Sequence, residues 1–484
     1  MNLNPELLDI QAAVRAGHSV TVEAGAGCGK TTAIVKVIAP ELPLQTVFLA
    51  FNKSIQTELE QRLPNREVKT FHSLALSALT KRLGRLPINA NKYKQHPSIA
   101  HLEYDDRSLV SDIISEFQLS NRGAQVQSKD ITFDFFLDVL DSRLENLEPT
   151  ENLTIDEAIS YAYAMFAPEI KKPSALTFDD MLWFLVHYAF EKRWSLRDYK
   201  CVVIDEAQDV SPIRLAIVKL LAPRCIAVGD RRQAIYKFAG AMSTALDEIG
   251  KHFNSVQLPL SMTWRCSSKV VEWSSHILGE SFLKARPDAP EGLVSETFYE
   301  AFLESDLDMR SMVLCRTNKP LVVLAIQLLK RRIPFRMQSD FPQKLIKKVE
   351  RIVKANSGGM AKFRTLVVEH YSDITANLKS PNVIARYEDE RDCILALSEE
   401  CRMPEEIKDK LEQIMSSKYG ILLTTAHKSK GLEADTVYIL APELIPAPWV
   451  PEDAIEDMQQ ETNLHYVMAT RAKTALLYIG AKPL

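Results

Sequence analysis

The 484-residue sequence has little excess charge of either sign, since 59 lysines and arginines face 63 aspartates and glutamates, for a net charge of −4. The sequence has no strongly basic domain that would indicate a polyanionic partner. It also has no acidic tail of the kind that stays solvated. No uninterrupted apolar run approaches the ~18–20 residues that span a bilayer. The first residues, MNLNPELLDIQ, lack the basic start of a signal peptide. We therefore expect a cytoplasmic protein without a membrane partner.

Cysteine patterning is also sparse. The seven cysteines form no C-x-x-C pair, and none lies at zinc-ligand spacing from a histidine. We interpret them as reduced thiols, most of them small core residues, and we expect neither a disulfide framework nor a structural zinc site. They are Cys28, Cys201, Cys225, Cys266, Cys315, Cys393 and Cys401.

Short apolar runs alternate with helical stretches, a pattern typical of parallel α/β sheets. At roughly 150 residues per domain the length suggests about three units. Helical periodicity dominates two intervals, which predicts two α/β cores, each interrupted by a helical insertion. The expected strands are 19–23, 46–51, 68–71, 201–205, 225–230, 312–316, 421–425, 436–440 and 475–479. The expected boundaries are 1–84 and 176–255 for the first core, 85–175 for its insertion, 256–340 and 419–484 for the second core, and 341–418 for the second insertion.

The most specific local signal is AGAGCGKTT, which follows a strand-like VTVE and precedes a helix-like TAIVKVI. This is the context of a phosphate-binding P-loop. Its glycines let backbone N–H groups turn around phosphate oxygens, Lys30 would reach the β- and γ-phosphates, and Thr31 would ligate Mg²⁺. The bland alternative is a Gly-rich turn that binds nothing. The expected nucleotide-binding residues here are Ala24, Gly25, Ala26, Gly27, Cys28, Gly29, Lys30, Thr31 and Thr32.

A P-loop needs an acid for the metal, and CVVIDEAQD supplies candidates. Asp205 would hold Mg²⁺ and Glu206 would orient and deprotonate the attacking water. Taken alone, the pair could be a surface turn after a buried strand. We expect ATP and Mg²⁺ as ligands.

With these residues in place, the sequence resembles superfamily 1 helicases of the UvrD/PcrA/Rep group. The resemblance is carried in the family's order by AFNKSIQTEL, TFHSL, TFDDML, IDEAQD, VGDRRQAIYKFAGA, LSMTWRC, CRTN, TTAHKSKGLEAD and NLHYVMATRAK. The FNK and TWRC variants look closest to F-box-helicase-like and phage or mobile-element members. The resemblance implies an α/β fold with two RecA-like P-loop motor cores and ATP in the cleft between them.

The resemblance also implies roles at matching positions. Gln11 would read the adenine edge and Trp264 would stack on adenine. Gln233 would sense the γ-phosphate, and Glu433 would contact the ribose side. Arg265 and Arg471 would act as arginine fingers; without the resemblance each would be an ordinary solvated or structural arginine.

A single-strand track needs stacking faces for bases and donors for phosphates. Each aromatic could instead be a core residue, and a motif does not show which polar side chain reaches the strand. The expected base-stacking residues are Phe51, Tyr236 and Phe238. The expected phosphate or sugar contacts are Asn52, Thr70, His72, Asn318, Thr425 and His427.

Two features depart from the family pattern. Ala239 stands where the family commonly has an arginine that couples nucleotide state to DNA, so coupling would rest on Lys237 or Arg232. The interval between Asn318 and Thr424 is short, which suggests a reduced 2B-like insertion, and the chain ends 13 residues (484 − 471) after Arg471. Two basic segments between Asn318 and Thr424, LKRRIPFR and KLIKKVERIVK, could touch duplex DNA or form a solvated helix face.

These observations predict an ATP-dependent translocase on single-stranded DNA and a DNA helicase of 3′→5′ polarity, acting at single-strand/duplex junctions and fitting DNA repair. It would be nucleoid-associated if bacterial or phage-encoded. The alternative is a nucleotide-regulated DNA-binding ATPase subunit of a larger nuclease or anti-phage defence complex, which would bring a protein partner. A small-molecule kinase is a weaker third possibility, because the late arginine motifs argue against it.

Overall fold

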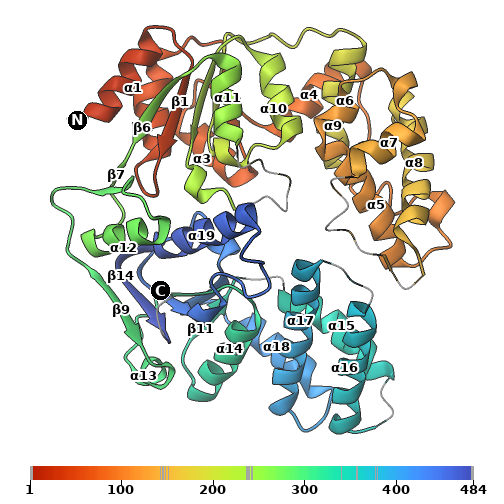
Figure 1. Ribbon diagram of the computed structural model, residues 1–484, viewed down its shortest axis with the longest axis vertical. Helices are drawn as coiled ribbons and strands as arrows, with labels where there is room; N and C mark the ends of the chain where they lie inside the picture. Colours follow the sequence, from red (N-terminus) through yellow and green to blue (C-terminus); the bar gives the residue numbers. More distant parts are fainter. Residues whose placement is uncertain are drawn as a thin grey trace. The chain divides into compact units, whose positions relative to one another are not determined.

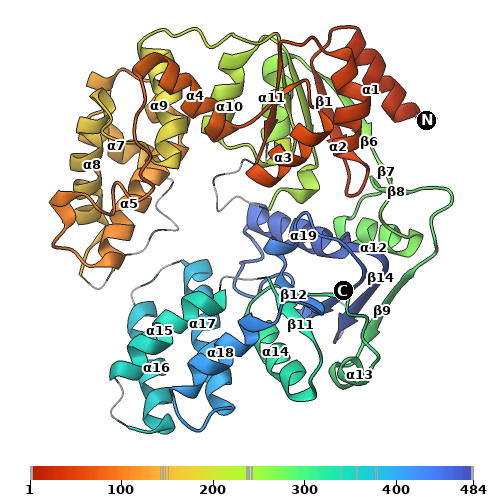
Figure 2. The ribbon, with the colours of Figure 1, turned by 180° about the vertical axis from the view of Figure 1, so that it is seen from behind.

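The computed structural model describes residues 4–141, 143, 147, 149–150, 152–235, 240, 242, 244–338, 341–355, 358–376, 378 and 380–480, with the backbone alone at Ala355. The chain forms two units (Figures 1 and 2). Unit 1 comprises Met1–Gly25 and Gly29–Ser261, and unit 2 comprises Ala26–Cys28 and Met262–Leu484. No helix in the described part of the chain has the length and apolarity needed to cross a membrane.

Unit 1 is built on a six-stranded parallel sheet with the order β3-β2-β4-β5-β1-β6. Its interior strands are buried on both faces, as parallel sheets covered by helices require. The strands are β1 Val20–Ala24, β2 Thr46–Ala50, β3 Glu67–Thr70, β4 Cys201–Ile204, β5 Cys225–Gly229 and β6 Val256–Leu260. The helices that accompany the sheet are α1 Pro5–Arg15, α2 Lys30–Ala33 with its continuation Ile34–Ile38, α3 Lys53–Arg62, α4 Phe71–Leu83, α10 Pro212–Leu221 and α11 Ala245–Phe253.

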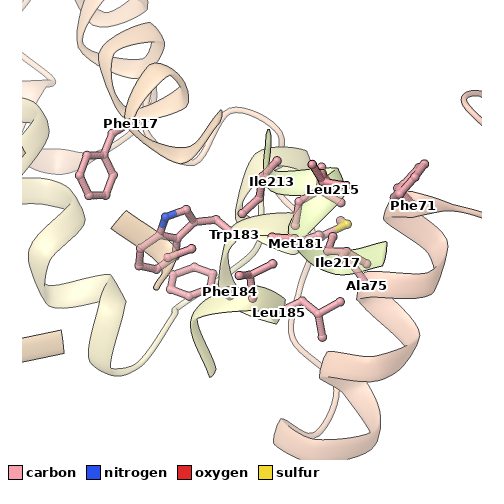
Figure 3. Close-up of a cluster of buried hydrophobic side chains, with 14 of the residues drawn as sticks. Phe71, Ala75, Phe117, Met181, Trp183, Phe184, Leu185, Ile213, Leu215 and Ile217 are labelled. Carbon is pink, nitrogen blue, oxygen red and sulfur yellow. The ribbon is translucent and has the colours of Figure 1, made fainter. Parts of the chain in front are cut away.

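The helical insertion of unit 1 shares one hydrophobic core with the sheet. Trp183 on α9 is fully buried and packs edge-on against Phe166 of α8, with ring centroids 5.0 Å apart. Figure 3 shows Trp183 and Phe184 beside Ile213 of α10, with Phe71 of α4 on the opposite side. The insertion is therefore anchored by α9. Its helices are α5 Tyr104–Leu119, α6 Asn121–Ala124, α7 Phe133–Leu140, α8 Ile155–Lys171 and α9 Phe178–Glu191.

A buried polar cluster fixes the start of this insertion. Lys92 Nζ lies 2.7 Å from Asp180 Oδ2, and Tyr93 donates its hydroxyl to Asp180 Oδ1 at 2.8 Å. Asp180 also accepts from Gln118 Nε2 at 2.6 Å. Residues 85–103, at the start of the expected insertion, carry the short 3₁₀ turn Pro97–Ile99 before α5, and Lys92 and Tyr93 tie this segment to Asp180.

Unit 2 repeats the plan with a second six-stranded parallel sheet, in the order β11-β12-β10-β13-β14-β9. Its strands are β9 Leu293–Thr297, β10 Met312–Cys315, β11 Phe335–Met337, β12 Ile421–Thr425, β13 Ala434–Leu440 and β14 Ala472–Ile479, with β7 Met262–Thr263 and β8 Lys284–Ala285 forming a separate pair. The accompanying helices are α12 Ser268–Leu278, α13 Tyr299–Glu304, α14 Lys319–Arg331 and α19 Ile455–Ala469.

The insertion of unit 2 is a group of helices that lies beside α14 (Figure 2). These are α15 Phe341–Ala355, α16 Met360–Thr375, α17 Pro381–Glu399 and α18 Glu406–Ser416. Leu345, Val349 and Ile352 of α15 are buried, as the helical periodicity of KLIKKVERIVK predicts. They join the core formed by α14 and the sheet, so this insertion too is continuous with its sheet.

All nine predicted strands are present, with ends displaced by at most three residues. The sequence analysis missed β6, β9 and β11, along with the short β7–β8 pair. β6, β9 and β11 all lie at sheet edges, as does β3, which was predicted. Edge strands bury less side-chain area, and β6 even contains Pro259, so the apolar signal on which strand prediction depends is weak there.

Candidate functional site

The phosphate loop follows β1 and leads into α2. Gly27 and Gly29 have φ of +69° and +83°, a left-handed backbone that only glycine adopts without strain. Gly25 donates its N–H to the Leu260 carbonyl at 3.0 Å, which fixes the loop where it leaves the sheet. Helical backbone begins at Lys30, so the unpaired N–H groups of the first turn are available to an anion.

Lys30 and Glu206 form an ion pair at this site. Lys30 Nζ lies 3.0 Å from Glu206 Oε2, and the lysine side chain is only 12% exposed. Burial works to lower the pKa of Lys30, but the carboxylates of Glu206, Asp230 and Asp205 outweigh it and raise the pKa. Lys30 is therefore held as a cation, ready for phosphate oxygens.

Asp205 and Asp230 follow the carboxyl ends of the neighbouring strands β4 and β5. Burial, then the charge of Glu206, raises the pKa of Asp205 to about 7. Burial also raises the pKa of Asp230, although Lys30 opposes it. Three carboxylates thus surround one ammonium, an excess of negative charge that suits a divalent cation.

The donor set fits Mg²⁺ bound together with a nucleotide. Mg²⁺ is normally held by one or two carboxylates, substrate phosphates and water, not by a cage of protein ligands. Within the described ranges, no group of three or more His, Cys, Asp or Glu side chains could hold a metal alone. Thr31 lies next to Lys30 in α2, so its side chain and Asp205 are the residues that would hold the ion.

Gln208 joins the two acidic turns. Its Nε2 donates to Glu206 Oε2 at 2.6 Å, and its Oε1 accepts from the Asp230 backbone N–H at 2.9 Å. Glu206 has φ of +53°, an uncommon conformation for a residue with a side chain, which aims its carboxylate at Lys30. Gln233 donates to Asp230 Oδ2 at 2.7 Å, so the expected γ-phosphate sensor belongs to the same network.

A second charged cluster, of one glutamate and two arginines, flanks this network and was missed by the sequence analysis. Glu23, on β1, accepts from Arg231 Nε at 2.6 Å and from Arg232 Nη1 at 2.7 Å. It thus links the strand before the phosphate loop to the turn after β5. In the sequence, the only sign of this cluster was a glutamate inside a predicted strand.

Gln11, the expected adenine contact, lies on α1. Its Nε2 donates to Glu41 Oε1 at 2.9 Å, and Glu41 also pairs with Arg15 at 2.8 Å. The structure therefore places Gln11 in unit 1, with its amide engaged by a carboxylate.

In unit 2 the expected nucleotide residues gather around Glu433. Glu433 Oε2 accepts from Arg265 Nε at 2.8 Å and its Oε1 lies 2.9 Å from Lys473 Nζ. Trp264 is 59% exposed, with the Arg286 guanidinium 5.9 Å from its ring centroid. The flat face of an exposed indole suits stacking on a base.

Arg471 is buried, unlike an ordinary solvated arginine, and only 1% of it is exposed. Its Nε donates to the Val467 carbonyl at 2.9 Å, and its Nη1 donates to the Leu432 carbonyl at 3.2 Å. The backbone N–H of Ala434 in turn donates to the Arg471 carbonyl at 3.1 Å. Arg471 and the loop carrying Glu433 are therefore neighbours.

The expected nucleic-acid residues of unit 1 follow β2 and β3. Phe51 lies under the Arg214 guanidinium, and Asn52 caps α3 by accepting from the Ile55 N–H at 2.9 Å. Thr70 caps α4 by accepting from the Ser73 N–H at 3.1 Å. His72 packs edge-on against Phe178, and burial followed by the charge of Arg214 lowers its pKa to about 4.

The expected nucleic-acid residues of unit 2 follow β10 and β12. Asn318 donates its side-chain amide to Asp389 Oδ2 at 3.0 Å, and Thr425 is the last residue of β12. Burial, then the charge of Arg316, lowers the pKa of His427 to about 3. Tyr236 and Phe238, together with Lys237 and Ala239, lie outside the described residues.

Comparison with known families gives two matches along the chain. The description "UvrD/REP helicase N-terminal domain" matches residues 3–254, and "UvrD-like helicase C-terminal domain" matches residues 364–482. Relatives include F-box DNA helicase protein 1 of Schizosaccharomyces pombe, 24% identical over 97% of this chain and 56% of that protein. DNA helicase IV of Escherichia coli is 26% identical over 58% of this chain and 47% of that protein.

ATP-dependent DNA helicase PcrA of Bacillus subtilis is 24% identical over 53% of this chain and 36% of that protein. The chain thus spans about half of the length of the curated relatives that it matches. Since the N-terminal family description alone covers more than half of the 484 residues, the chain belongs to the UvrD/Rep helicase family.

Proposed function

We propose that the chain hydrolyses ATP and uses the energy to move along single-stranded DNA in the 3′→5′ direction, opening duplex DNA at single-strand/duplex junctions. The observation that carries the ATPase part is the buried network of Lys30, Asp205, Glu206, Gln208 and Asp230. Family membership supports the DNA part, through relatives named as DNA helicases.

Each residue of the network has a defined task in this proposal. Lys30 binds the β- and γ-phosphates, and the N–H groups at the start of α2 add further donors. Mg²⁺, held by Thr31 and Asp205, neutralises phosphate charge when bound. Glu206 orients the attacking water and accepts its proton, and Gln208 keeps that carboxylate in place.

The Lys30–Glu206 pair links nucleotide binding to hydrolysis in this proposal. Lys30 Nζ donates to Glu206 Oε2 at 3.0 Å. Phosphate oxygens compete for the same ammonium, so ATP binding would release Glu206 to act on water. The site would therefore become competent only when substrate is bound.

The second unit supplies the remaining expected groups. We propose that Trp264 stacks on adenine, that Glu433 contacts the ribose, and that Arg265 and Arg471 stabilise negative charge during phosphoryl transfer. Arg265 is paired with Glu433 at 2.8 Å, which balances its charge.

The test combines ATPase and strand-displacement assays on the full chain. ATPase activity that single-stranded DNA stimulates many-fold, and that is lost in Lys30→Ala, is expected. DNA binding with an ATPase that ignores DNA would instead favour a nucleotide-regulated subunit of a larger nuclease or defence complex. A duplex with a 3′ tail should be displaced and a duplex with a 5′ tail should not; the opposite preference would refute the polarity.

A further inference from the structure

Gln11 on α1 is hydrogen-bonded to a carboxylate that lies on the helical stretch leaving the phosphate loop. Its Nε2 donates to Glu41 Oε1 at 2.9 Å. Glu41 is the last residue of the short turn Ala39–Glu41, which continues the helical backbone that begins at Lys30. The expected adenine contact is therefore tied to the segment that carries the phosphate-binding lysine.

Arg15, one turn after Gln11 on α1, fixes the carboxylate of Glu41. Its Nε donates to Oε2 at 3.0 Å and its Nη2 donates to Oε1 at 2.8 Å, so both oxygens are engaged. The hydrogen bond from Arg15 is the largest influence on the pKa of Glu41 and lowers it, helped by the bond from Gln11 and opposed by burial. Glu41 is therefore ionised near neutral pH, and an ionised carboxylate can only accept hydrogen bonds.

The charge of Glu41 determines which way the amide of Gln11 faces. An amide has an oxygen that accepts hydrogen bonds and a nitrogen that donates two hydrogens, and its two ends have almost the same shape. A partner that can only accept binds the nitrogen and repels the oxygen. One N–H of Gln11 thus goes to Glu41, and the second N–H and Oε1 are the adjacent donor and acceptor that the amide can offer to a ligand.

This donor and acceptor distinguish between purines. The N7 edge of adenine presents an acceptor at N7 and a donor at the 6-amino group, and a glutamine can pair with both. Guanine presents two acceptors on the same edge, at N7 and O6, as hypoxanthine does. With the amide fixed, Oε1 of Gln11 would meet an amino group in adenine but a carbonyl oxygen in the other two bases. An amide that could turn over would lose much of this selectivity, because its N–H could then face O6.

We propose that Glu41 is a positioning residue that makes the nucleotide site selective for 6-aminopurines, by holding the amide of Gln11 in the orientation that matches adenine. This rests on the proposed function, with Gln11 as its adenine contact. It assigns the choice of base to a residue that none of the motifs singled out in the sequence contains.

The test compares the hydrolysis of ATP with that of ITP, which carries a 6-oxo group in place of the 6-amino group. Steady-state kcat and KM are measured for both nucleotides with the full chain and single-stranded DNA, and the ratio of the two kcat/KM values is the readout. Wild type should prefer ATP roughly 10–100-fold, the range for a bidentate contact to a base edge.

Glu41→Ala removes the acceptor and lets the amide of Gln11 turn over. The preference for ATP over ITP should fall roughly 10-fold, the loss expected for one oriented hydrogen bond. The change should appear mainly in KM, because the residues that bind phosphate are untouched. An unchanged preference in Glu41→Ala would overturn the proposal.

Arg15→Met is the matched control. It breaks the same ion pair but leaves the carboxylate that accepts from Gln11, so it should keep the wild-type preference for ATP. The side chain of Arg15 is 67% exposed, and exposed ion pairs contribute little to stability. If Arg15→Met lowers the preference as much as Glu41→Ala, the pair only supports α1 and the proposal is wrong.

A double variant separates positioning from direct contact with the base. Gln11→Ala should itself abolish the preference for ATP, and Glu41→Ala should then have no further effect on the ratio, because it acts only through the amide. A further fall in the Gln11→Ala background would show that Glu41 acts without Gln11, and a preference that survives Gln11→Ala would remove Gln11 from base selection. Either result would overturn the proposal.

The wild-type measurement distinguishes the two levels of failure. A wild-type chain that hydrolyses ATP and ITP equally well would overturn base selection by Glu41 and leave the proposed ATPase intact. A wild-type chain that hydrolyses neither nucleotide would overturn the proposed function, and this inference with it.

Discussion

Lys30 Nζ and Glu206 Oε2 lie 3.0 Å apart, so the cation expected to bind phosphate neutralises the carboxylate expected to activate water. Gln208 approaches the same carboxylate oxygen at 2.6 Å. The base is thus held by two donors at once. Removing its charge should affect hydrolysis far more than nucleotide binding, because Lys30 keeps its position next to the loop.

Glu206→Gln should therefore lower kcat for ATP by roughly 10²–10⁴-fold, the usual contribution of a general base. ATP affinity, measured with a fluorescent analogue, should stay within a few-fold of wild type or improve, since Lys30 no longer has a carboxylate competitor. Glu350→Gln is the matched control: Glu350 pairs with Lys408 at 2.6 Å on the insertion of unit 2, and its loss should leave kcat unchanged. An unaltered kcat in Glu206→Gln would remove the residue from the mechanism.

Gly229, the last residue of β5, gives a second prediction. A Cβ at this position would lie 2.6 Å from Gln208 Oε1 and 3.0 Å from the Gln208 backbone nitrogen. Because backbone cannot yield easily, Gly229→Ala should push Gln208 away from Glu206 and lower kcat at least 10-fold, while the sheet remains folded.

The control for that variant is Gly359→Ala. Gly359 precedes α16 with φ of −75°, and a Cβ there would meet nothing within 4 Å. We expect wild-type ATPase activity and a free energy of unfolding within about 0.5 kcal/mol of wild type. Equal behaviour of the two alanine variants would show that the Gln208 bridge is dispensable.

The strands that carry the candidate nucleotide site could be predicted because they are buried on both faces and their motifs follow them directly. Lys30, Asp205 and Glu206 were singled out from the motifs that carry them, and the structure brings them together. The Gln208 bridge could not be predicted in the same way, because its bonds join turns that follow two different strands.

Other residues escaped prediction for a related physical reason. In the sequence Glu23 looks like an ordinary strand residue. Only the fold brings it next to Arg231 and Arg232, which follow the neighbouring strand β5. Arg316 forms a bidentate pair with Glu461 and stacks on Trp449 at 5.3 Å, although these residues lie far apart in sequence.

Trp264 offers a prediction that separates binding from chemistry. The residue is 59% exposed, so Trp264→Ala should not change the thermal midpoint by much. Loss of one stacked base should raise KM for ATP roughly 10-fold with little change in kcat, since base–aromatic stacking contributes about 1–3 kcal/mol. Phe298→Ala, another exposed aromatic of unit 2 at 80%, is the control and should leave KM unchanged. A fall in kcat at constant KM would contradict adenine stacking.

His465 on α19 makes stability depend on pH with a definite sign. Its Nε2 lies 2.7 Å from the Tyr478 hydroxyl, and burial, then the charge of His276, lowers its pKa from 6.5 to about 4. Between pH 6.5 and 4 the imidazole is protonated in the unfolded chain but neutral in the folded chain. The free energy of unfolding therefore falls as pH drops from about 6.5 toward 4. Above about pH 7 this residue has no effect on it. At pH 5 the loss from this residue should be about 2 kcal/mol.

His465→Gln removes that titration but keeps a side chain that can hydrogen-bond Tyr478. Urea unfolding at pH 7.5, 6 and 5 should show the variant less stable than wild type at pH 7.5, because glutamine fills the site less well. The difference in free energy of unfolding between wild type and variant should narrow by about 2 kcal/mol by pH 5. Only the wild type keeps a buried imidazole neutral in acid, and this lowers its stability. The other buried histidines are shared by both proteins and cancel in the difference. A gap that is constant, or that widens in acid, would show that His465 is protonated in the folded chain.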